Sequence, residues 1–268
     1  MHVVRPRDLD EVVDALATYP GATLLAGGTD LMVEVNLLHR RPETVVCLRR
    51  VEELRTFEPG FIGAGVSWAR LEHGPLPALA ELSRTVGSPQ IRAAGTLGGN
   101  LGTASPAGDG LTFLAAVDAQ VVLASTAGRR RLPWSEFLVG PKRTARRDDE
   151  VIVGVEVPPD AAAWPQAFAK VGVRQAMVIA IVSCCVVHAA VDDVRVAMGA
   201  VGPTVLRVPD AEAAVAGGGS PSPERLAHFE ALVRDGIAPI TDHRGTEGYR
   251  RHAAGVLARR TLERCLVP

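Results

Sequence analysis

Apolar residues near the start of the chain recur with the spacing of a helix. Their positions are Leu9, Val12, Val13 and Leu16. This i, i+3, i+4, i+7 spacing places them on one helical face. Asp8 precedes the stripe and Glu11 follows it by three residues, an acidic variant of the capping box that begins helices. Because Pro20 and Gly21 end the pattern, we expect one short amphipathic helix here.

Short apolar runs bounded by turn residues follow, and they predict strands. The apolar runs cover residues 23–26, 44–48, 61–65, 120–124 and 151–157, and a turn at 126–128 leads from the fourth of them into residues 129–132. A helix is expected over about 76–86, where Leu79, Leu82 and Val86 share one face. Strands and helices alternate at short spacing before residue 56, and strands dominate after it. The pattern predicts a small α/β unit over residues 1–56 and a mixed unit over 57–159.

The last hundred residues have a different pattern. Strands are expected over 166–171, 180–191 and 194–201, with a loop at 217–221. Ser222 precedes Pro223, and Gly236 lies thirteen residues further on, which is the arrangement of a capped helix. A final helix is expected over about 246–265. Because Pro158 and Pro159 cannot continue a strand, we place the start of a third unit, 160–268, after them.

Charge and composition exclude several classes of protein. The 268 residues carry 29 Lys and Arg against 30 Asp and Glu, a net charge of −1, and 47% of them are hydrophobic. Nucleic-acid binding needs clustered cations, and the longest basic run, residues 129–131, has only three; the other runs, such as 146–147, have two. The apolar content excludes intrinsic disorder. A folded protein with no nucleic-acid partner is expected.

The chain shows no targeting or membrane pattern. Its first residues lack the basic and then apolar pattern of a signal peptide. The most apolar run, 177–191, contains Ser183 and His188 and is too short to cross a bilayer as a helix. A cytoplasmic protein without a membrane span is therefore expected.

The cysteines and histidines predict no metal site. Cys47 and Cys265 are isolated, and the adjacent Cys184 and Cys185 have a spacing that seldom forms a disulfide. There is no CxxC pair for zinc or an iron–sulfur cluster, so buried reduced thiols are expected. The seven histidines are scattered.

Patterns of common catalytic and nucleotide-binding sites are missing or incomplete. There is no P-loop, and the glycines at 63 and 65 lack the third glycine of a Rossmann fingerprint. Ser67 misses the nucleophile elbow by one residue and is expected to cap a short helix. No catalytic residue is predicted.

Two glycine-rich segments remain as candidate binding loops. The first covers residues 25–31, directly after a strand, and the second covers 95–109. Glycine pairs permit positive φ and let amide groups converge on an anion. Because residues 93–128 contain no Lys or Arg, an anion bound there would be neutralised by backbone amides. Both segments could instead be plain turns.

Polar side chains of the second segment could bind a ligand beside the anion. Asn100, Thr103 and Ser105 offer neutral hydrogen-bonding groups, and Asp109 could accept from ribityl or ribose hydroxyls. These side chains suit a polyol or the edge of a heterocycle.

The two loops, in this order, resemble a known family. Residues 26–32, AGGTDLM, resemble the first FAD-binding loop of the flavoprotein (medium) subunit of molybdenum hydroxylases, the family of xanthine and carbon monoxide dehydrogenases. Residues 86–92, continuing through TLGGN at 96–100 and ASPAGD at 104–109, resemble the second. The likeness extends through 128–138 and 150–152 to Phe168, Lys170 and Arg174.

The resemblance implies an α+β chain with the PCMH-type FAD-binding fold. Two subdomains, one small α/β and one mixed, would hold FAD between them, followed by a three-stranded antiparallel sheet with a helix bundle. Residues 25–32 would wrap the pyrophosphate, residues 96–100 would close on its other side, Ile152 would contact the flavin and Lys170 would lie near its ring system. The cofactor-binding residues implied by loop chemistry and resemblance together are Leu25, Ala26, Gly27, Gly28, Thr29, Asp30, Leu31, Met32, Thr96, Leu97, Gly98, Gly99, Asn100, Thr103, Ser105, Asp109, Ile152 and Lys170.

Some positions depart from the family pattern. Met177 stands where an aspartate is common, Asn36 where a lysine often follows the first loop, and Val3–Val4 where an aromatic residue is usual. These departures affect the electron-acceptor side more than FAD binding. Residues 21–35 contain no histidine, so FAD is expected to be bound non-covalently. No cysteine-rich insertion for an additional iron–sulfur cluster is present.

The resemblance implies an electron-transfer subunit that is incomplete alone. A large subunit would carry the molybdenum cofactor, and a small subunit would carry two [2Fe–2S] clusters that pass electrons to FAD. The acceptor would be NAD⁺, a quinone or another molecule, in a complex that is a dimer of heterotrimers. One alternative is a self-sufficient flavin reductase on the same fold, like the UDP-N-acetylmuramate-forming reductase. Another is a catalytically silent scaffold whose loops are only turns.

Overall fold

The computed structural model describes residues 1–175, 177–217 and 221–266. The N-terminal unit is a parallel sheet of three strands in the order β1–β3–β2. Its elements are β1 (His2–Val4), α1 (Leu9–Thr18), β2 (Thr23–Leu25), α2 (Leu31–Asn36) and β3 (Thr44–Cys47). The Asp8 side chain accepts a hydrogen bond from the Glu11 amide, so α1 begins where the sequence predicts. Two 3₁₀ turns, Leu48–Arg50 and Glu52–Arg55, lead out of this unit.

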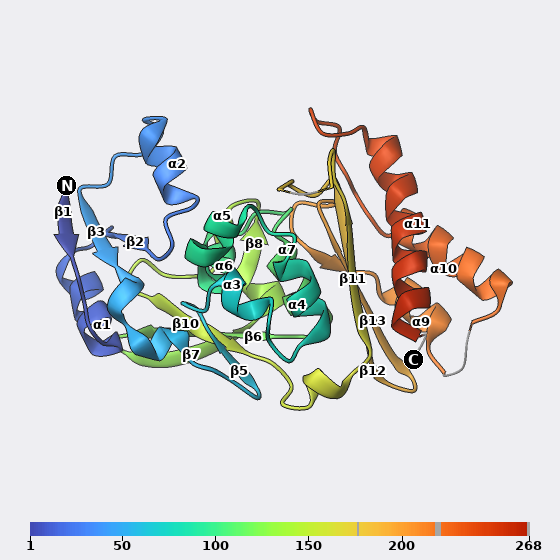
Figure 1. Cartoon of the computed structure of the whole chain (residues 1–268), viewed down its shortest axis with the longest axis horizontal. Helices are drawn as coiled ribbons and strands as arrows, with labels where there is room; N and C mark the ends of the chain where they lie inside the picture. The colour runs from blue at the N-terminus through green and yellow to red at the C-terminus, as the bar shows by residue number, and fades with distance from the viewer. Residues whose placement is uncertain (176, 218–220, 267–268) are drawn as a thin grey trace.

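The middle unit is an antiparallel sheet of five strands in the order β4–β5–β10–β6–β7. The strands are β4 (Phe57–Glu58), β5 (Phe61–Gly63), β6 (Gln120–Ser125), β7 (Gly128–Pro133) and β10 (Val151–Glu156), with a separate hairpin of β8 (Leu138–Gly140) and β9 (Arg143–Thr144). The helices are α3 (Trp68–Leu71), α4 (Pro77–Ser83), α5 (Pro89–Ala94), α6 (Leu97–Thr103), α7 (Asp109–Ala116) and α8 (Trp134–Phe137). In Figure 1 most of these helices cluster between the N-terminal unit and the C-terminal sheet.

The C-terminal unit is an antiparallel sheet covered on one face by helices (Figure 1). After the 3₁₀ turn Ala161–Ala163, its elements are β11 (Gln166–Val171), β12 (Val182–Ala190), β13 (Asp193–Gly199), β14 (Leu206–Arg207), α9 (Pro209–Val215), α10 (Pro223–Asp235) and α11 (Glu247–Leu266). Three strands are predicted and four are found, because the chain pairs once more with β13 through the short β14. The predicted loop at 217–221 lies partly outside the described residues.

Both faces of the five-stranded and the four-stranded sheet are buried, and one face of each sheet packs against a neighbouring unit. On β6, Val121 and Leu123 belong to the core of the middle unit, whereas Val122 and Ala124 pack in the core shared with α1. On β12, Cys185 and Val187 face the middle unit, and the side chains at 184 and 186 face α9–α11. This alternation is the period of two of a strand buried on both faces. The C-terminal sheet therefore shares its core with the middle unit.

Several helices lie where the sequence predicts none: α2, α5, α6, α7, α8 and α9. The segment 95–110 is expected to be a loop because of its glycines, yet it contains α6 and the first two residues of α7. Thr96 begins α6 by accepting a hydrogen bond from the Gly99 amide at 3.0 Å, and α6 ends at Ala104 with a φ of 46°. α2 follows the first glycine loop and has no buried residue, so it lacks the apolar stripe that would predict it.

Candidate functional site

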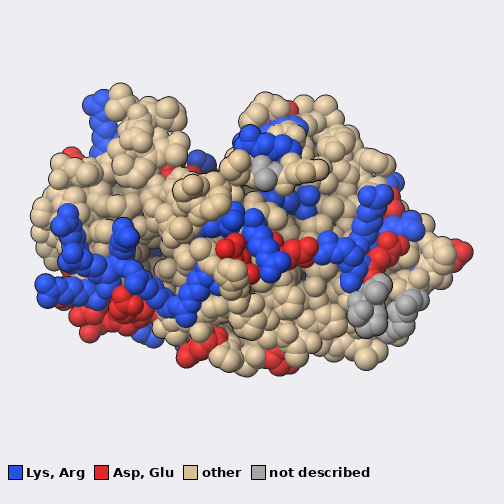
Figure 2. All heavy atoms as spheres, in the orientation of Figure 1, with Lys and Arg blue, Asp and Glu red and all other residues tan. Residues whose placement is uncertain are grey.

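A cleft of about 1130 Å³ runs between the N-terminal and middle units. Its walls come from the end of β2 with the loop 26–30, from residues 64–68, from α6, and from residues 105–109. Residues 177–179 of the C-terminal unit also line it. Figure 2 shows the surface hollowed between the protruding α2 and the upper end of the C-terminal unit. The two segments singled out by their glycines thus face one space.

The first glycine loop packs tightly against the start of the second segment. A Cβ on Gly27 would lie 1.8 Å from the carbonyl oxygen of Ala94, so no side chain fits there. Gly28 has a φ of 72°, a conformation that favours glycine. Among the described residues, no hydrogen bond uses the amides of residues 27–30 as donors. These amides are therefore available to an anion in the cleft.

The amides at the start of α6 already have partners within the protein. Leu97 donates to the Val66 carbonyl at 3.1 Å, and Gly98 donates to the Ala64 carbonyl at 2.8 Å. A Cβ on Gly98 would lie 2.5 Å from the Cβ of Ala64, so this glycine allows the close approach. Here the second segment shapes the cleft wall, and the amides of its first turn are not free for a ligand. A hydrogen bond of 3.1 Å from Thr103 Oγ1 to Asp30 Oδ2 ties the two segments together.

Two buried acceptors on the cleft-lining residues lack partners. They are Asn100 Oδ1 and Asp109 Oδ1. The other oxygen of Asp109 accepts a hydrogen bond from Lys170 Nζ at 2.6 Å, and both side chains are only 8% exposed. Burial raises the pKa of Asp109, and the Lys170 ammonium partly offsets this rise. A buried acceptor without a partner is costly, so a ligand that supplies donors would be favoured.

Cationic side chains line the cleft, although the second segment has none. They come from other parts of the chain: Arg40, Arg49, Arg55, Arg70, Lys142 and Arg146. Several are already engaged; for example, Arg40 lies 3.8 Å from Glu34, and Arg70 donates to the Arg55 carbonyl at 2.6 Å. A bound anion would therefore meet cations as well as backbone amides in this cleft. Charges distant in sequence contribute positive potential to the same cleft.

The cleft brings together most of the residues predicted to bind a cofactor. Three of them do not line it: Met32, Leu97 and Lys170. Met32 is on the exposed side of α2, and Leu97 is fully buried in the core of the middle unit. Lys170 reaches the cleft only through Asp109, while its ammonium also donates to the carbonyls of Thr85 and Val178.

Several lining residues were missed because nothing local marks them. Trp68 follows Ser67, which caps α3 as predicted, and this tryptophan also lines the cleft. Met177 and Ile179, which are half-exposed, line the cleft from the C-terminal unit. Their only signal in the sequence is the departure from the family pattern at position 177. Only the tertiary fold places them beside the glycine loops.

The described residues contain no group of three or more His, Cys, Asp or Glu that could hold a metal ion. No helix among them is both long and apolar enough to cross a membrane. The four cysteines are free: Cys184, Cys185 and Cys265 are buried, and Cys47 is half-buried. Reduced thiols are thus as expected, with Cys47 less buried than the others.

Comparison with known proteins covers almost the whole chain. The family model of the FAD binding domain in molybdopterin dehydrogenase matches residues 1–160, and that of the CO dehydrogenase flavoprotein C-terminal domain matches residues 167–265. The nicotine 6-hydroxylase medium subunit of Paenarthrobacter nicotinovorans is 30% identical, over 96% of this chain and 94% of that protein. The nicotinate dehydrogenase FAD-subunit of Eubacterium barkeri is 34% identical, over 66% of this chain and 64% of that protein.

A solved structure agrees with these matches. It is the carbon monoxide dehydrogenase of Hydrogenophaga pseudoflava that lacks the Mo-pyranopterin moiety of its cofactor. A chain of that enzyme superposes with a TM-score of 0.91 at 31% identity, covering 99% of this chain and 96% of that one. The likeness extends through all three units, in agreement with the expected PCMH-type fold. The chain therefore belongs to the FAD-binding medium subunits of the molybdenum hydroxylases, a family of oxidoreductase flavoproteins.

Proposed function

We propose that this chain binds FAD non-covalently in the cleft and passes electrons between a reductant on a partner subunit and an external acceptor. The observation that carries the proposal is the pair of buried acceptors without partners, Asn100 Oδ1 and Asp109 Oδ1, beside a glycine loop with free amides. A dinucleotide with a diphosphate and several hydroxyl groups supplies what both features need: an anion and hydrogen-bond donors.

The residues present fit this cofactor. The amides of residues 27–30, with Arg49 and Lys142, which also line the cleft, would hold the diphosphate. Asn100 and Asp109 would accept hydrogen bonds from ribityl or ribose hydroxyls, with Thr103 and Ser105 beside them. Ile152 gives an apolar contact for the flavin, and Leu25, Ala26, Leu31, Thr96, Gly98 and Gly99 shape the walls. Met32, Leu97 and Lys170 do not line the cleft and would support the residues that do.

The chain contributes binding, orientation and shielding. FAD, when bound, supplies the electron-transfer chemistry. The glycine loop and the buried acceptors would hold the diphosphate and the hydroxyl groups of the cofactor. Trp68 and Ile152 would exclude water from the apolar parts of the cleft. No proton has to be moved by a side chain of this subunit, and no residue is assigned a catalytic role.

Turnover would need partner subunits. Relatives are named as medium or FAD subunits, and the likeness spans nearly all of this chain. We propose a large subunit with the molybdenum cofactor and a small [2Fe–2S] subunit as partners, in a cytoplasmic dimer of heterotrimers. NAD⁺, a quinone or another molecule would be the acceptor. Three units with boundaries at 1–56, 57–159 and 160–268 are retained, the last supported by the gap between the two family matches.

The central test is cofactor binding by the purified chain. After incubation with excess FAD and gel filtration, the protein is expected to be yellow, with about one intact FAD released per chain by acid precipitation. Asn100→Ala is expected to raise the Kd for FAD about tenfold, because a hydrogen bond to a buried group contributes about 0.5–1.5 kcal/mol and its loss leaves a polar ligand group unpaired. Asn36→Ala, on the exposed α2 outside the cleft, is the matched control.

The outcomes separate this proposal from its alternatives. A colourless protein that ignores FAD would favour the silent scaffold. Flavin left on the denatured chain would refute non-covalent binding. Turnover by the isolated chain alone, with an electron donor oxidised and a second substrate reduced in equal amounts, would favour a self-sufficient flavin reductase over a subunit that depends on partners.

A further inference from the structure

Helix α7 runs from the cleft along the face of the C-terminal sheet that packs on the middle unit. All eight of its residues are buried, and its first residue, Asp109, lines the cleft. Asp118 lies just past its other end, with a φ of 52°. At 1.5 Å per residue these two carboxylates are separated by roughly 14 Å of nearly rigid backbone. Contacts that hold Asp118 in place therefore also restrict the position of Asp109.

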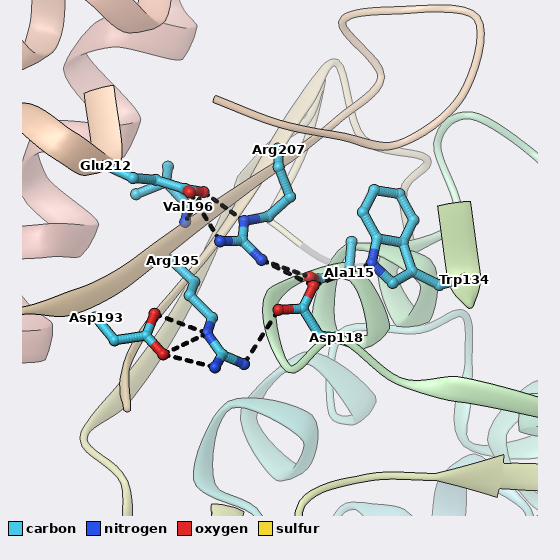
Figure 3. Close-up of polar contacts among 8 residues, drawn as sticks. All are labelled: Ala115, Asp118, Trp134, Asp193, Arg195, Val196, Arg207 and Glu212. Carbon is cyan, nitrogen blue, oxygen red and sulfur yellow. Dashed lines mark hydrogen bonds and ion pairs between the residues drawn. The ribbon is translucent and has the colours of Figure 1, made fainter. Parts of the chain in front are cut away.

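Two arginines of the C-terminal unit bind Asp118, as Figure 3 shows. Arg195 Nη1 lies 3.3 Å from Oδ2, and Arg207 Nη1 lies 3.0 Å from Oδ1. Arg207 also donates to the carbonyl oxygen of Ala115 in the last turn of α7 at 3.4 Å. Trp134 Nε1 donates to Asp118 at 3.3 Å. Cations at the C-terminal end of a helix are favoured by the helix dipole as well as by the carboxylate.

Each arginine is itself held in place by a second carboxylate. Asp193 accepts from Arg195 Nε at 2.9 Å and from Nη2 at 2.6 Å, and the Arg195 guanidinium lies 5.3 Å from the centre of the Trp164 ring. Glu212 pairs with Arg207, with 2.7 Å between Nη2 and Oε2. Both arginine side chains are less than 20% exposed, at 16% and 18%. Because Asp193 and Glu212 already hold the two guanidinium groups in place, little side-chain entropy is lost when the arginines contact Asp118.

The C-terminal unit also contacts the rest of this segment. Lys170 pairs with Asp109 at its start, and the hydroxyls of Thr112 and Ser183 are 3.2 Å apart in its middle. The Ala200 amide donates to the Pro106 carbonyl at 2.8 Å, just before α7. One sheet therefore holds the helix along its whole length.

We infer that Asp118, Arg195 and Arg207 form a positioning device for the cofactor: by clamping the far end of α7, they place the Asp109 carboxylate for the cofactor's hydroxyls. None of the three touches the cleft, so they are positioning residues. The inference rests on the proposed binding of FAD. The C-terminal unit would thus help to retain the cofactor, although these three residues lie outside the cleft.

Asp118→Asn tests this inference with little risk to the fold. Asparagine tolerates the left-handed backbone at 118, and each arginine keeps its second carboxylate. We expect the Kd for FAD to rise at least about fivefold, mainly through faster release, since coupling between sites is typically 5- to 150-fold. The matched control is Arg264→Gln, which breaks another ion pair between the middle and C-terminal units, to Glu81 at 2.7 Å, without touching α7.

A double-mutant cycle with Asp109→Asn separates positioning from general weakening. If Asp118 acts through Asp109, Asp118→Asn has little effect on the Kd once Asp109 is Asn. Equal Kd values for Asp118→Asn and Arg264→Gln, or an undiminished effect in the Asp109→Asn background, would overturn the inference. If Asp118→Asn does not fold, Arg207→Lys provides the same test. Lysine keeps the positive charge but lacks the two guanidinium branches that contact Asp118 and Glu212 together. If the wild-type chain itself binds no FAD, the proposed function fails instead.

Discussion

At the residue scale, two glycines allow close backbone contacts beside the cleft. Gly27 places the first loop against the Ala94 carbonyl, and Gly98 places α6 against Ala64. In both places a Cβ would meet backbone or Cβ atoms, which cannot swing aside as the end of a flexible side chain can. The contact between the two units at Gly27, and the packing within the middle unit at Gly98, therefore depend on the absence of a side chain at these positions.

Gly27→Ala is expected to weaken FAD binding and to destabilise the protein. The added Cβ would sit 1.8 Å from the Ala94 carbonyl oxygen, so the loop must move away from α5 and α6. Forcing a group into a packed site typically costs about 1–3 kcal/mol. Thermal unfolding and FAD titration measure both effects. Gly248→Ala in α11, where nothing lies within 4 Å, is the control. If the two variants behaved alike, the close approach at Gly27 would be unimportant.

The buried thiols are expected to be unreactive in the native protein. Burial raises the pKa of Cys184 to about 12 and that of Cys265 to about 11, and it also raises the pKa of Cys185. Since the thiolate is the nucleophile, a disulfide reagent at pH 8 should modify only Cys47. After unfolding in guanidinium chloride all four should react. More than one fast-reacting thiol in the folded chain would contradict this prediction.

At the element scale, features with a local cause were predictable from the sequence. Asp8 and Ser222 begin α1 and α10 by accepting amide hydrogen bonds, and these signals need only three or four neighbouring residues. α6 was missed because its glycines favour a loop, whereas contacts with Ala64 and Val66 hold it as a helix. The short β14 was missed because it forms only against a strand already in place.

The candidate site was predictable to a similar extent. The two glycine segments and Asp109 were found because they are contiguous in sequence and match a family pattern. The cations, from Arg40 to Arg146, come from turns, the short helix α3 and a hairpin that only the tertiary fold brings to the cleft. The contact between Asp109 and Lys170 spans 61 positions, and no local rule pairs such residues.

The contact between α11 and the turn that precedes it should depend on pH. Arg250, which is 3% exposed, donates to Asp242 at 2.7 Å and to the Ala200 carbonyl at 2.9 Å. Although burial opposes ionisation, the amide of Arg244 and the Arg250 side chain lower the pKa of Asp242 to about 2. The pKa is depressed in the folded state, so the stabilisation is complete above about pH 4 and is lost as the pH falls toward 2.

Asp242→Asn is the variant that tests this dependence. At pH 7 it should cost roughly 3 kcal/mol, because it removes one partner of a buried charge. The difference in free energy of unfolding from the wild type should shrink as the pH is lowered from about 4 to 2, since the wild type then loses the same interaction. Urea titrations across this range measure it. A difference that stayed constant with pH would show that the charge on Asp242 is not what holds Arg250.

At the scale of the whole molecule, the units are joined unequally. The middle unit and the C-terminal sheet share one core that includes Phe113, Phe168 and Val187. The N-terminal unit instead packs through α1 against the other face of β6 and β10, with the cleft opening beside that contact. A ligand in the cleft would therefore add contacts where the molecule has fewest of its own.

Bound FAD should accordingly stabilise the packing of the N-terminal unit on the middle unit. A ligand that binds only the folded state adds about 2.7 kcal/mol at a concentration of 100 times its Kd. For a chain of this size that corresponds to a rise in Tm of roughly 5 to 10 °C. Removing FAD should reverse the rise, and hydrogen exchange should show the largest change in protection at residues 27–30, whose amides have no partner of their own among the described residues. A Tm independent of FAD, or a change in protection confined to the C-terminal unit, would mean that the ligand does not bridge the cleft.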